Sequence, residues 1–340
     1  VVSCPCALVI SVPLSYFGGI GGASRFGIMI KGANYLEELA SAKTFVFDKT
    51  GTLTKGSFAV TKIVPDGMTE NELLGICAAA ETYSTHPIAQ SIIAEGKKAS
   101  LTVTASDAEE IAGYGVRAQV GGKTALVGNH RLMERENIPV PAVDSAGTVV
   151  HCAVDGKYAG YIVISDEIKP GTPAALASLK KLCSARTIML TGDRKAAAEA
   201  VARQAGIDEF QSRVEELYKA KPEGSTLVFV GDGMNDAPAL ARADVGIAMG
   251  AMGSDAAIEA ADIVLMNDNI ESLPTAVRIS RKTHAIVMQN IVFAIGVKVL
   301  IMILTALGIT NMWVAVFGDV GVAVIAILNA MRTLGTRKKI

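Results

Sequence analysis

Three short loops that combine aspartate with glycine are the part of this sequence best suited to chemistry. They are "DKTGTLT" (48–54), "TGD" (191–193) and "GDGMND" (231–236), and each directly follows a run rich in apolar residues. Repeats of strand, loop and helix indicate a parallel sheet whose ligands bind at the carboxyl ends of the strands. We therefore expect the three loops to converge at one edge of such a sheet.

The first loop offers a nucleophile. Asp48 stands at the tip of an apolar run and is followed by Thr50 and Gly51. A carboxylate in this position can attack an electrophile, and the backbone N–H groups of such a loop suit an incoming phosphoryl group. The alternative, that Asp48 only caps a helix or turn, does not explain why the two other acidic loops follow in the same chain.

Together, the three motifs and their order resemble the P-type ATPases, ion pumps with a haloacid-dehalogenase-like catalytic core. The resemblance implies an α/β fold: a Rossmann-like parallel sheet forming a haloacid-dehalogenase-like phosphorylation domain, an inserted α+β nucleotide-binding domain, and transmembrane α-helices. It implies that Asp48 takes the γ-phosphoryl group of ATP as an aspartyl-phosphate and helps to hold Mg²⁺. Lys49 and Thr50 would orient and screen the transferred group. Because Thr50 stands where related phosphatases keep an acid/base aspartate, a haloacid-dehalogenase-like phosphatase is the less favoured alternative.

The other two motifs supply the remaining catalytic residues that the resemblance implies. Thr191 would donate a hydrogen bond to the phosphoryl oxygens, and Asp193 would lie near the nucleotide. Asp232 would hold Mg²⁺, with Asn235 and Asp236 completing the polar shell. This set suits phosphoryl transfer, because the reaction depends mainly on positioning and on neutralising spread negative charge.

Scattered motifs between the first two loops resemble the adenine pocket of the heavy-metal-transporting branch of this family. That branch uses a Glu five residues before a His-Pro pair, then a Gly-x-Gly and a Gly-Asn. Taken alone each motif is weak, because His86 could simply cap the helix that Pro87 begins and the glycines could form an ordinary turn. The matching residues are Glu81, His86, Gly113, Gly115 and Asn129.

Two cysteines flank a proline near the start of the chain, in "VVSCPCALVI". Cysteines two residues apart are unsuited to disulfide geometry, so Cys4 and Cys6 are either small buried side chains or metal ligands. In the heavy-metal branch a Cys-Pro-Cys in a membrane helix is the transport site, where thiolates bind soft or borderline cations. The resemblance therefore implies that Cys4 and Cys6 are ligands of the transported ion.

Two ionisable residues lie inside apolar runs further along the chain. Lys298 stands in "AIGVKVLIM" and Asp319 in "AVFGDVGVAV", and charged groups inside membrane spans are costly and usually functional. A buried structural ion pair is the alternative. The pair resembles the zinc/cadmium/lead subgroup rather than the copper(I) subgroup, and a carboxylate beside two thiolates suits a divalent ion such as Zn²⁺. The transported cation is therefore expected to be Zn²⁺, Cd²⁺ or Pb²⁺.

The composition agrees with a membrane protein. Hydrophobic residues make up 50% of the 340 residues and charged residues 19%. Runs at 286–309 and 312–331 are each about long enough to span a bilayer, and basic residues outside them place both outer ends in the cytoplasm. The apolar N-terminal run reads as the remainder of another span, so we interpret the chain as a fragment of a plasma (inner) membrane protein with cytoplasmic catalytic domains.

The expected partners are ATP, a divalent heavy-metal ion and the lipid bilayer. A net charge of −1 gives no reason to expect a nucleic-acid partner. The expected organisation comprises five parts. These are a partial transmembrane helix with a cytosolic extension (1–40), a phosphorylation domain (41–58 and 162–278), a nucleotide-binding domain (59–161) and two transmembrane helices (284–308 and 311–333).

Two departures from the family pattern leave an alternative open. The sequence contains no Thr-Gly-Glu actuator loop, and the usual Leu-Pro-x-x-Lys segment before "GDG" is missing. Lys219 and Lys221 are the nearby lysines, and neither has that context. Either one of them replaces the phosphate-binding lysine, or the chain is an incomplete or catalytically impaired pump that still binds nucleotide and metal.

Overall fold

The computed structural model describes residues 6–84, 86–100, 103–143, 145, 147–192, 195–211, 225–232, 237–250, 255–309 and 311–335. It divides into two compact units. The first unit contains Val1–Leu53, Pro170–Thr191 and Gln204–Ile340, and the second contains Thr54–Lys169 and Gly192–Arg203.

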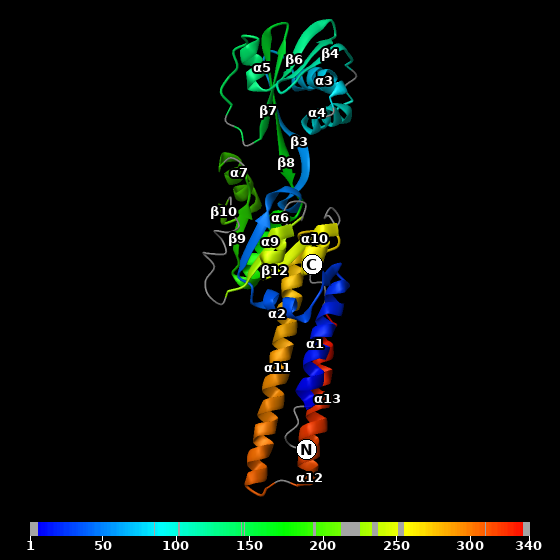
Figure 1. Ribbon diagram of the computed structural model, residues 1–340, viewed down its shortest axis with the longest axis vertical. Helices are drawn as coiled ribbons and strands as arrows, with labels where there is room; N and C mark the ends of the chain where they lie inside the picture. Colours follow the sequence, from blue (N-terminus) through cyan, green and yellow to red (C-terminus); the bar gives the residue numbers. More distant parts are fainter. Residues whose placement is uncertain are drawn as a thin grey trace. The chain divides into compact units, whose positions relative to one another are not determined.

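A seven-stranded sheet forms the centre of the first unit, with the strand order β1-β13-β12-β11-β2-β9-β10 (Figure 1). All neighbouring strands are parallel except the pair β1 and β13. The strands are β1 (Ile28–Ile30), β2 (Thr44–Asp48), β9 (Arg186–Leu190), β10 (Glu209–Gln211), β11 (Leu227–Gly231), β12 (Val245–Met249) and β13 (Ile263–Leu265). The helices that lie between these strands in sequence are α2 (Ala33–Ser41), α6 (Thr172–Cys183), α9 (Ala237–Arg242) and α10 (Asp255–Ala260), together with α7 (Lys195–Ala205), most of which belongs to the second unit.

The central strands of this sheet are apolar along their whole length. β11 and β12 are buried at every position, as are the three middle residues of β2. Strands covered on both faces have this composition, which distinguishes parallel sheets from sheets with one solvated face. The strand, loop and helix repeats expected from the sequence are therefore confirmed at β9 and β11, which are followed by α7 and α9, whereas the loop after β2 leads into the strand β3 instead of a helix.

The second unit is built on a six-stranded antiparallel sheet with the order β3-β8-β7-β6-β5-β4. α3 begins at a capping box formed by Thr69 and Glu72. One face packs against α3 and α4 through residues such as Leu73, Ile92 and Val127, and α5 packs through Leu132 against Leu126 in a second cluster. The elements are β3 (Thr54–Pro65), α3 (Glu70–Ala80), η2 (Glu81–Tyr83), α4 (Pro87–Lys98), β4 (Ala105–Ile111), β5 (Gly115–Val120), β6 (Lys123–Gly128), α5 (His130–Arg135), β7 (Thr148–Val154) and β8 (Lys157–Ile168).

The junctions of the second unit lie outside the range 59–161 expected from the sequence. The unit begins at Thr54 and its main segment ends at Lys169. The reason is that β3 and β8 pair with each other from Thr54↔Ile168 to Pro65↔Gly160. Both strands therefore belong to one sheet, and the end of β8 lies in the second unit and not in the phosphorylation domain expected from the sequence.

Three helical segments in the described residues are long and apolar enough to cross a membrane, namely Ala7–Ser24, Ser272–Ala306 and Met312–Thr333. The second is longer than expected, because α11 begins at Ser272, about four turns before the apolar run at 286–309. Its polar first part is amphipathic and buries Leu273, Val277 and Ile279. The elements are α1 (Cys6–Ser24), α11 (Ser272–Ala306), α12 (Met312–Val316), η3 (Phe317–Gly321), α13 (Val322–Ala330) and η4 (Met331–Thr333).

Candidate functional site

The carboxyl ends of β9, β2 and β11 bring three of the expected residues to the same edge of the sheet. Asp48 ends β2 and pairs in register with Leu190 of β9, so Thr191 follows directly beside it. On the other side Phe47 pairs with Val230 of β11, so Asp232 comes just after the neighbouring strand end. Asp193, Asn235 and Asp236 belong to the same loops but lie outside the described residues.

Gly51 connects the first loop directly to Asp232. Its φ is +75°, a conformation that side chains with a Cβ rarely adopt. A Cβ placed on Gly51 would overlap Asp232 Oδ2 and lie 3.0 Å from its Cγ. The loop backbone therefore lies directly against a carboxylate that is 9% exposed, and only glycine allows this approach. This role of Gly51 depends on a contact with a distant loop and could not be predicted from the sequence.

The residues around this edge are suited to a divalent cation and a phosphoryl group. Asp48 is half-buried and Asp232 is buried, and carboxylate oxygens are the ligands that Mg²⁺ prefers. Thr52 is fully buried, and its Oγ1 has no hydrogen-bond partner within the described residues. An orphaned buried hydroxyl at a loop with two carboxylates fits a site that receives a polar ligand. The donor set therefore fits Mg²⁺ held by Asp48 and Asp232.

Lys49 is half-buried, and Thr50 is exposed with an extended backbone. The end of the loop is fixed by Thr172, which is buried at the start of α6 and donates a hydrogen bond from Oγ1 to Leu53 O at 3.2 Å. Thr191 is held through its main chain, because its N–H donates to Gln211 O at 3.0 Å. Lys219 and Lys221, the two lysines considered as phosphate ligands, lie outside the described residues.

In the second unit, Glu81 is the most perturbed of the expected nucleotide residues. It lies in η2 and is 7% exposed. Burial, together with the negative charge of Glu110, raises the pKa of Glu81 from 4.5 to about 7. Buried carboxyls with strongly shifted pKa values cluster at functional sites, which makes Glu81 a candidate site residue.

His86 has the capping role, one of the two that the sequence left open. It is the N-cap of α4, where Nδ1 accepts a hydrogen bond from Ile88 N at 3.2 Å and Pro87 is the first helical residue. Because Nδ1 is an acceptor, the neutral ring carries its proton on Nε2. The residue is exposed, so capping leaves the Nε2–H of His86 free to bind a ligand.

Asn129 holds the Gly113–Gly115 turn in place. It caps α5 by accepting a hydrogen bond from Leu132 N at 3.1 Å, and its Nδ2 donates to Gly113 O at 2.9 Å. Gly115 has a φ of +150°, and a Cβ there would collide with the main chain of Val127. Gly115 therefore permits close packing of two strands, while Asn129 fixes the turn by its own side chain and keeps a second Nδ2–H and a second Oδ1 lone pair beyond these two contacts.

The two ionisable residues of the apolar helices lie beside each other. Lys298 Nζ is 4.0 Å from Asp319 Oδ1, and each side chain is 22% exposed. Both line a cavity between α11, η3 and the first turn of α1, which Ala7, Leu8 and Val322 help to form. Cys4 and the side chain of Cys6 are outside the described part of the chain, and Ala7 is the next residue along the helix.

Asp319 lies in a π-helical turn that the sequence did not predict. η3 runs from Phe317 to Gly321 between two α-helical segments, and single π turns of this kind are frequent at functional sites. A Cβ on Gly318 would overlap Ile301 Cδ1 of α11. The glycine next to Asp319 therefore allows η3 to approach α11 closely at the level of Lys298.

Known families and proteins match this chain over most of its length. The haloacid dehalogenase-like hydrolase family model matches residues 42–244. A zinc-transporting ATPase of Synechocystis sp. is 53% identical over 98% of this chain and 47% of its own length. A cadmium, zinc and cobalt-transporting ATPase of Bacillus subtilis is 52% identical over 100% of this chain and 50% of its own length. The chain thus spans about half the length of the curated relatives it matches.

Solved structures give the same assignment. The crystal structure of a zinc-transporting PIB-type ATPase superimposes with a TM-score of 0.86 at 37% identity, covering 98% of this chain and 56% of that chain. The catalytic domain of a CPx-ATPase gives a TM-score of 0.57 at 29% identity, covering 75% of this chain and 97% of that domain. These matches confirm the fold class expected from the sequence. The chain therefore belongs to the haloacid dehalogenase-like hydrolases and, within them, to the heavy-metal-transporting P-type ATPases.

Proposed function

We propose that the protein containing this chain uses ATP to export a divalent heavy-metal cation through an aspartyl-phosphate at Asp48. The placement of Asp48 beside Asp232 and Thr191, at one edge of a parallel sheet, is the observation that carries the proposal. A nucleophile, a second carboxylate and a hydroxyl donor at one sheet edge support this proposal, because phosphoryl transfer depends on positioning such groups around the phosphorus.

In the proposed reaction a carboxylate oxygen of Asp48 attacks the γ-phosphorus of ATP. The bond from that phosphorus to the β,γ-bridging oxygen breaks, and ADP leaves with the bonding electrons. Mg²⁺, when held by Asp48 and Asp232, would neutralise negative charge on the transferred group. Thr191 and Lys49 would hold the phosphoryl oxygens, and hydrolysis of the aspartyl-phosphate would later release inorganic phosphate and restore the Asp48 carboxylate.

We propose that the second unit binds the nucleotide. A buried Glu81 in its ionised form would accept a hydrogen bond from the adenine amino group, and His86 Nε2–H would donate to the ligand. Support comes from the raised pKa of Glu81 and from the capping contact that orients the ring of His86. The Gly113–Gly115 turn, fixed by Asn129, would leave room for the adenine against the main chain.

The proposed cargo is Zn²⁺ or Cd²⁺, with Pb²⁺ also expected from the subgroup resemblance. The relatives named above are described as transporters of zinc, cadmium and cobalt, so cobalt belongs in the same test. Cys4, Cys6 and Asp319 would bind the ion, and Lys298 would neutralise Asp319 after the ion has left. We further propose that the protein lies in the plasma (inner) membrane with both soluble units in the cytoplasm.

The native protein, reconstituted in lipid, tests this function through its ATP hydrolysis. Hydrolysis should rise with Zn²⁺ or Cd²⁺, and Asp319→Ala should lose that stimulation while Asp48→Asn loses hydrolysis altogether. Stimulation by Cu(I) alone, or an unchanged zinc response in Asp319→Ala, would contradict the proposed ion site. Hydrolysis that survives in Asp48→Asn would contradict the proposed nucleophile.

A further inference from the structure

Thr191 donates a main-chain hydrogen bond to β10, an edge strand whose pairing with the rest of the sheet is short. β10 has only three residues, Glu209–Gln211, and lies at the end of the sheet with β9 as its one neighbour. Gln211 pairs in register with Leu190, and its carbonyl accepts the N–H of Thr191 at 3.0 Å. The contact between Thr191 and Gln211 therefore depends on what fixes so short a strand.

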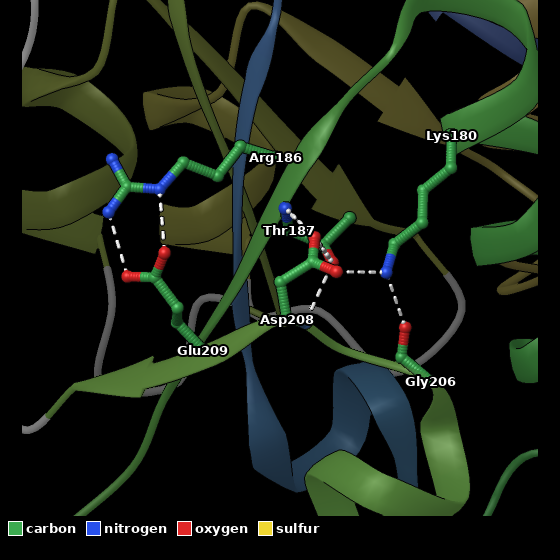
Figure 2. Close-up of polar contacts among 6 residues, drawn as sticks. All are labelled: Lys180, Arg186, Thr187, Gly206, Asp208 and Glu209. Carbon is green, nitrogen blue, oxygen red and sulfur yellow. Dashed lines mark hydrogen bonds and ion pairs between the residues drawn. The ribbon is translucent and has the colours of Figure 1, made fainter.

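Asp208, the residue just before β10, supplies that attachment (Figure 2). Its Oδ2 accepts two hydrogen bonds from Thr187 of β9, from N and from Oγ1, each at 2.9 Å. Its Oδ1 forms an ion pair with Lys180 of α6, and the same ammonium group donates to Gly206 O at 2.8 Å. One carboxylate thus joins β9, α6 and the segment leading into β10.

The neighbouring ion pair between Arg186 and Glu209 differs from the Asp208 contact in its exposure to solvent. Arg186 and Glu209 form a two-pronged ion pair with distances of 3.0 and 2.7 Å, but the side chains are 47% and 40% exposed. Exposed pairs of this type contribute little to stability. Thr187, in contrast, is 0% exposed, so its amide and hydroxyl groups depend on Asp208 for hydrogen bonds that water cannot replace.

The same contact recurs twice elsewhere in this sheet. Asp244, just before β12, accepts a hydrogen bond from Leu227 N of β11 at 2.7 Å. Asp262, just before β13, accepts one from Gly246 N of β12 at 2.8 Å. In each case an aspartate ahead of one strand holds the beginning of its neighbour, which fixes the register of the pair. Of these three contacts, the one made by Asp208 involves β10, the strand that accepts the hydrogen bond from Thr191.

We propose that Asp208 is a positioning residue for phosphoryl transfer, acting through β10 on Thr191. The inference rests on the proposed function, because it takes Thr191 as a phosphoryl-binding residue. Loosening β10 would shift Thr191 relative to Asp48, and displacements of about 1 Å in such sites cost up to about 100-fold in rate. The nucleotide residues belong to the other unit, so apparent affinity for ATP should stay unchanged.

The experiment compares Asp208→Asn with Asp262→Asn in the native full-length protein. Asp262 is the matched control, because it makes the same contact between strands whose carboxyl ends do not carry Asp48, Thr191 or Asp232. We would measure kcat and KM for ATP, and the inorganic phosphate concentration that gives half-maximal phosphorylation of the enzyme. Thermal unfolding of both variants reports the loss of stability that they share.

We expect both variants to lose similar stability. Asp208→Asn alone should lower kcat by about 10-fold and raise the half-maximal phosphate concentration several-fold, with KM for ATP within twofold of wild type. Thr187→Val should reproduce part of this defect and Thr187→Ser should restore wild-type values. These two variants test the same contact independently of whether Asp208→Asn folds.

Equal effects of Asp208→Asn and Asp262→Asn on all three measurements would overturn the proposal, as would a normal phosphate dependence in Thr187→Val. The proposed function fails separately. If the wild-type enzyme is phosphorylated neither by ATP nor by inorganic phosphate, the assignment of Asp48 is wrong. If the wild type is phosphorylated and Asp208→Asn behaves like it, only the positioning role is wrong.

Discussion

The carboxylate of Asp232 lies directly against the main chain of Gly51, in a space that a single methyl group would fill. The two residues are remote in sequence, yet this contact joins the loop of the nucleophile to the loop of the second carboxylate. Together with the register of β2 and β11, it puts Asp232 at the same sheet edge as Asp48, where we propose that both hold one cation. The contact depends on the absence of a Cβ and on the left-handed backbone of Gly51.

Gly51→Ala should therefore abolish phosphoryl transfer. A Cβ would overlap Asp232 Oδ2 and force either the loop or the carboxylate to move, so we expect phosphoenzyme formation to fall at least about 100-fold. Gly67→Ala is the matched control, because Gly67 has the same φ of +75° with nothing within 4 Å. That variant should lose about 1 kcal/mol of stability and keep its activity. Full phosphorylation of Gly51→Ala would contradict this account.

Nucleotide affinity should depend on pH through Glu81. The pKa of Glu81 is raised to about 7, first by burial and then by Glu110. Since the ionised carboxylate is the form expected to accept a hydrogen bond from adenine, affinity for ATP should rise between about pH 6 and pH 8. Glu110→Gln removes one cause of the shift and should move the rise to lower pH. A titration of ATP binding that is flat over this range in the wild type would refute the assignment.

The raised pKa of Glu81 should make the stability of the protein decrease with rising pH, whereas its affinity for ATP should increase. Between the unfolded value of 4.5 and the folded value of about 7, the folded protein binds more protons at Glu81 than the unfolded chain. Its stability therefore decreases as pH rises through this window. Glu81→Gln should be more stable than the wild type at pH 8, with a weaker dependence on pH, while binding ATP less tightly. Thermal unfolding at several pH values measures this, and a less stable Glu81→Gln at pH 8 would contradict it.

His86 allows its two roles to be separated by substitution. His86→Asn should keep the N-cap of α4, since asparagine is among the best capping residues, while removing the Nε2–H group. We expect ATP affinity to fall about 10-fold with little change in melting temperature, because one hydrogen bond to ligand is lost. His86→Ala should lose both affinity and stability. Normal ATP binding by His86→Asn would leave His86 with a structural role only.

Helix packing at the end of α1 should be sensitive to a single methyl group. A Cβ on Gly19 would lie 2.5 Å from Thr283 Oγ1 and 3.2 Å from Leu36 Cδ1, whereas the nearest atom to a Cβ on Gly21 is 3.9 Å away. Gly19→Ala should cost about 1–3 kcal/mol, as overpacking usually does, and Gly21→Ala should be tolerated. Thr283→Ala should partly rescue Gly19→Ala. Unfolding in detergent checks the series, and equal stability of the two glycine variants would count against this packing.

The fold and the main catalytic loops could be predicted because their signals are local. Apolar runs ending in Asp48, Thr191 and Asp232 indicate buried parallel strands, and two long apolar runs indicate spans. The close contact between the main chain of Gly51 and the carboxylate of Asp232 could not be predicted, because it depends on the register of β2 and β11. The start of α11 was also missed, since a polar amphipathic segment does not resemble a membrane span.

The contact between Thr187 and Asp208 was missed for a similar reason. Nothing in the sequence around Asp208 distinguishes it from an ordinary residue at a helix end, because its importance comes from a buried threonine on the neighbouring strand. His86 shows the opposite case. The His-Pro pair suggested both a cap and a ligand, and the structure contains the cap while leaving Nε2 available.

The most direct test of the central claim is phosphorylation of the native protein by ATP labelled in the γ-phosphate. The account predicts label that is stable in acid, sensitive to hydroxylamine, absent from Asp48→Asn and dependent on Zn²⁺ or Cd²⁺. Absence of label with every metal, or label that persists in Asp48→Asn, would contradict it.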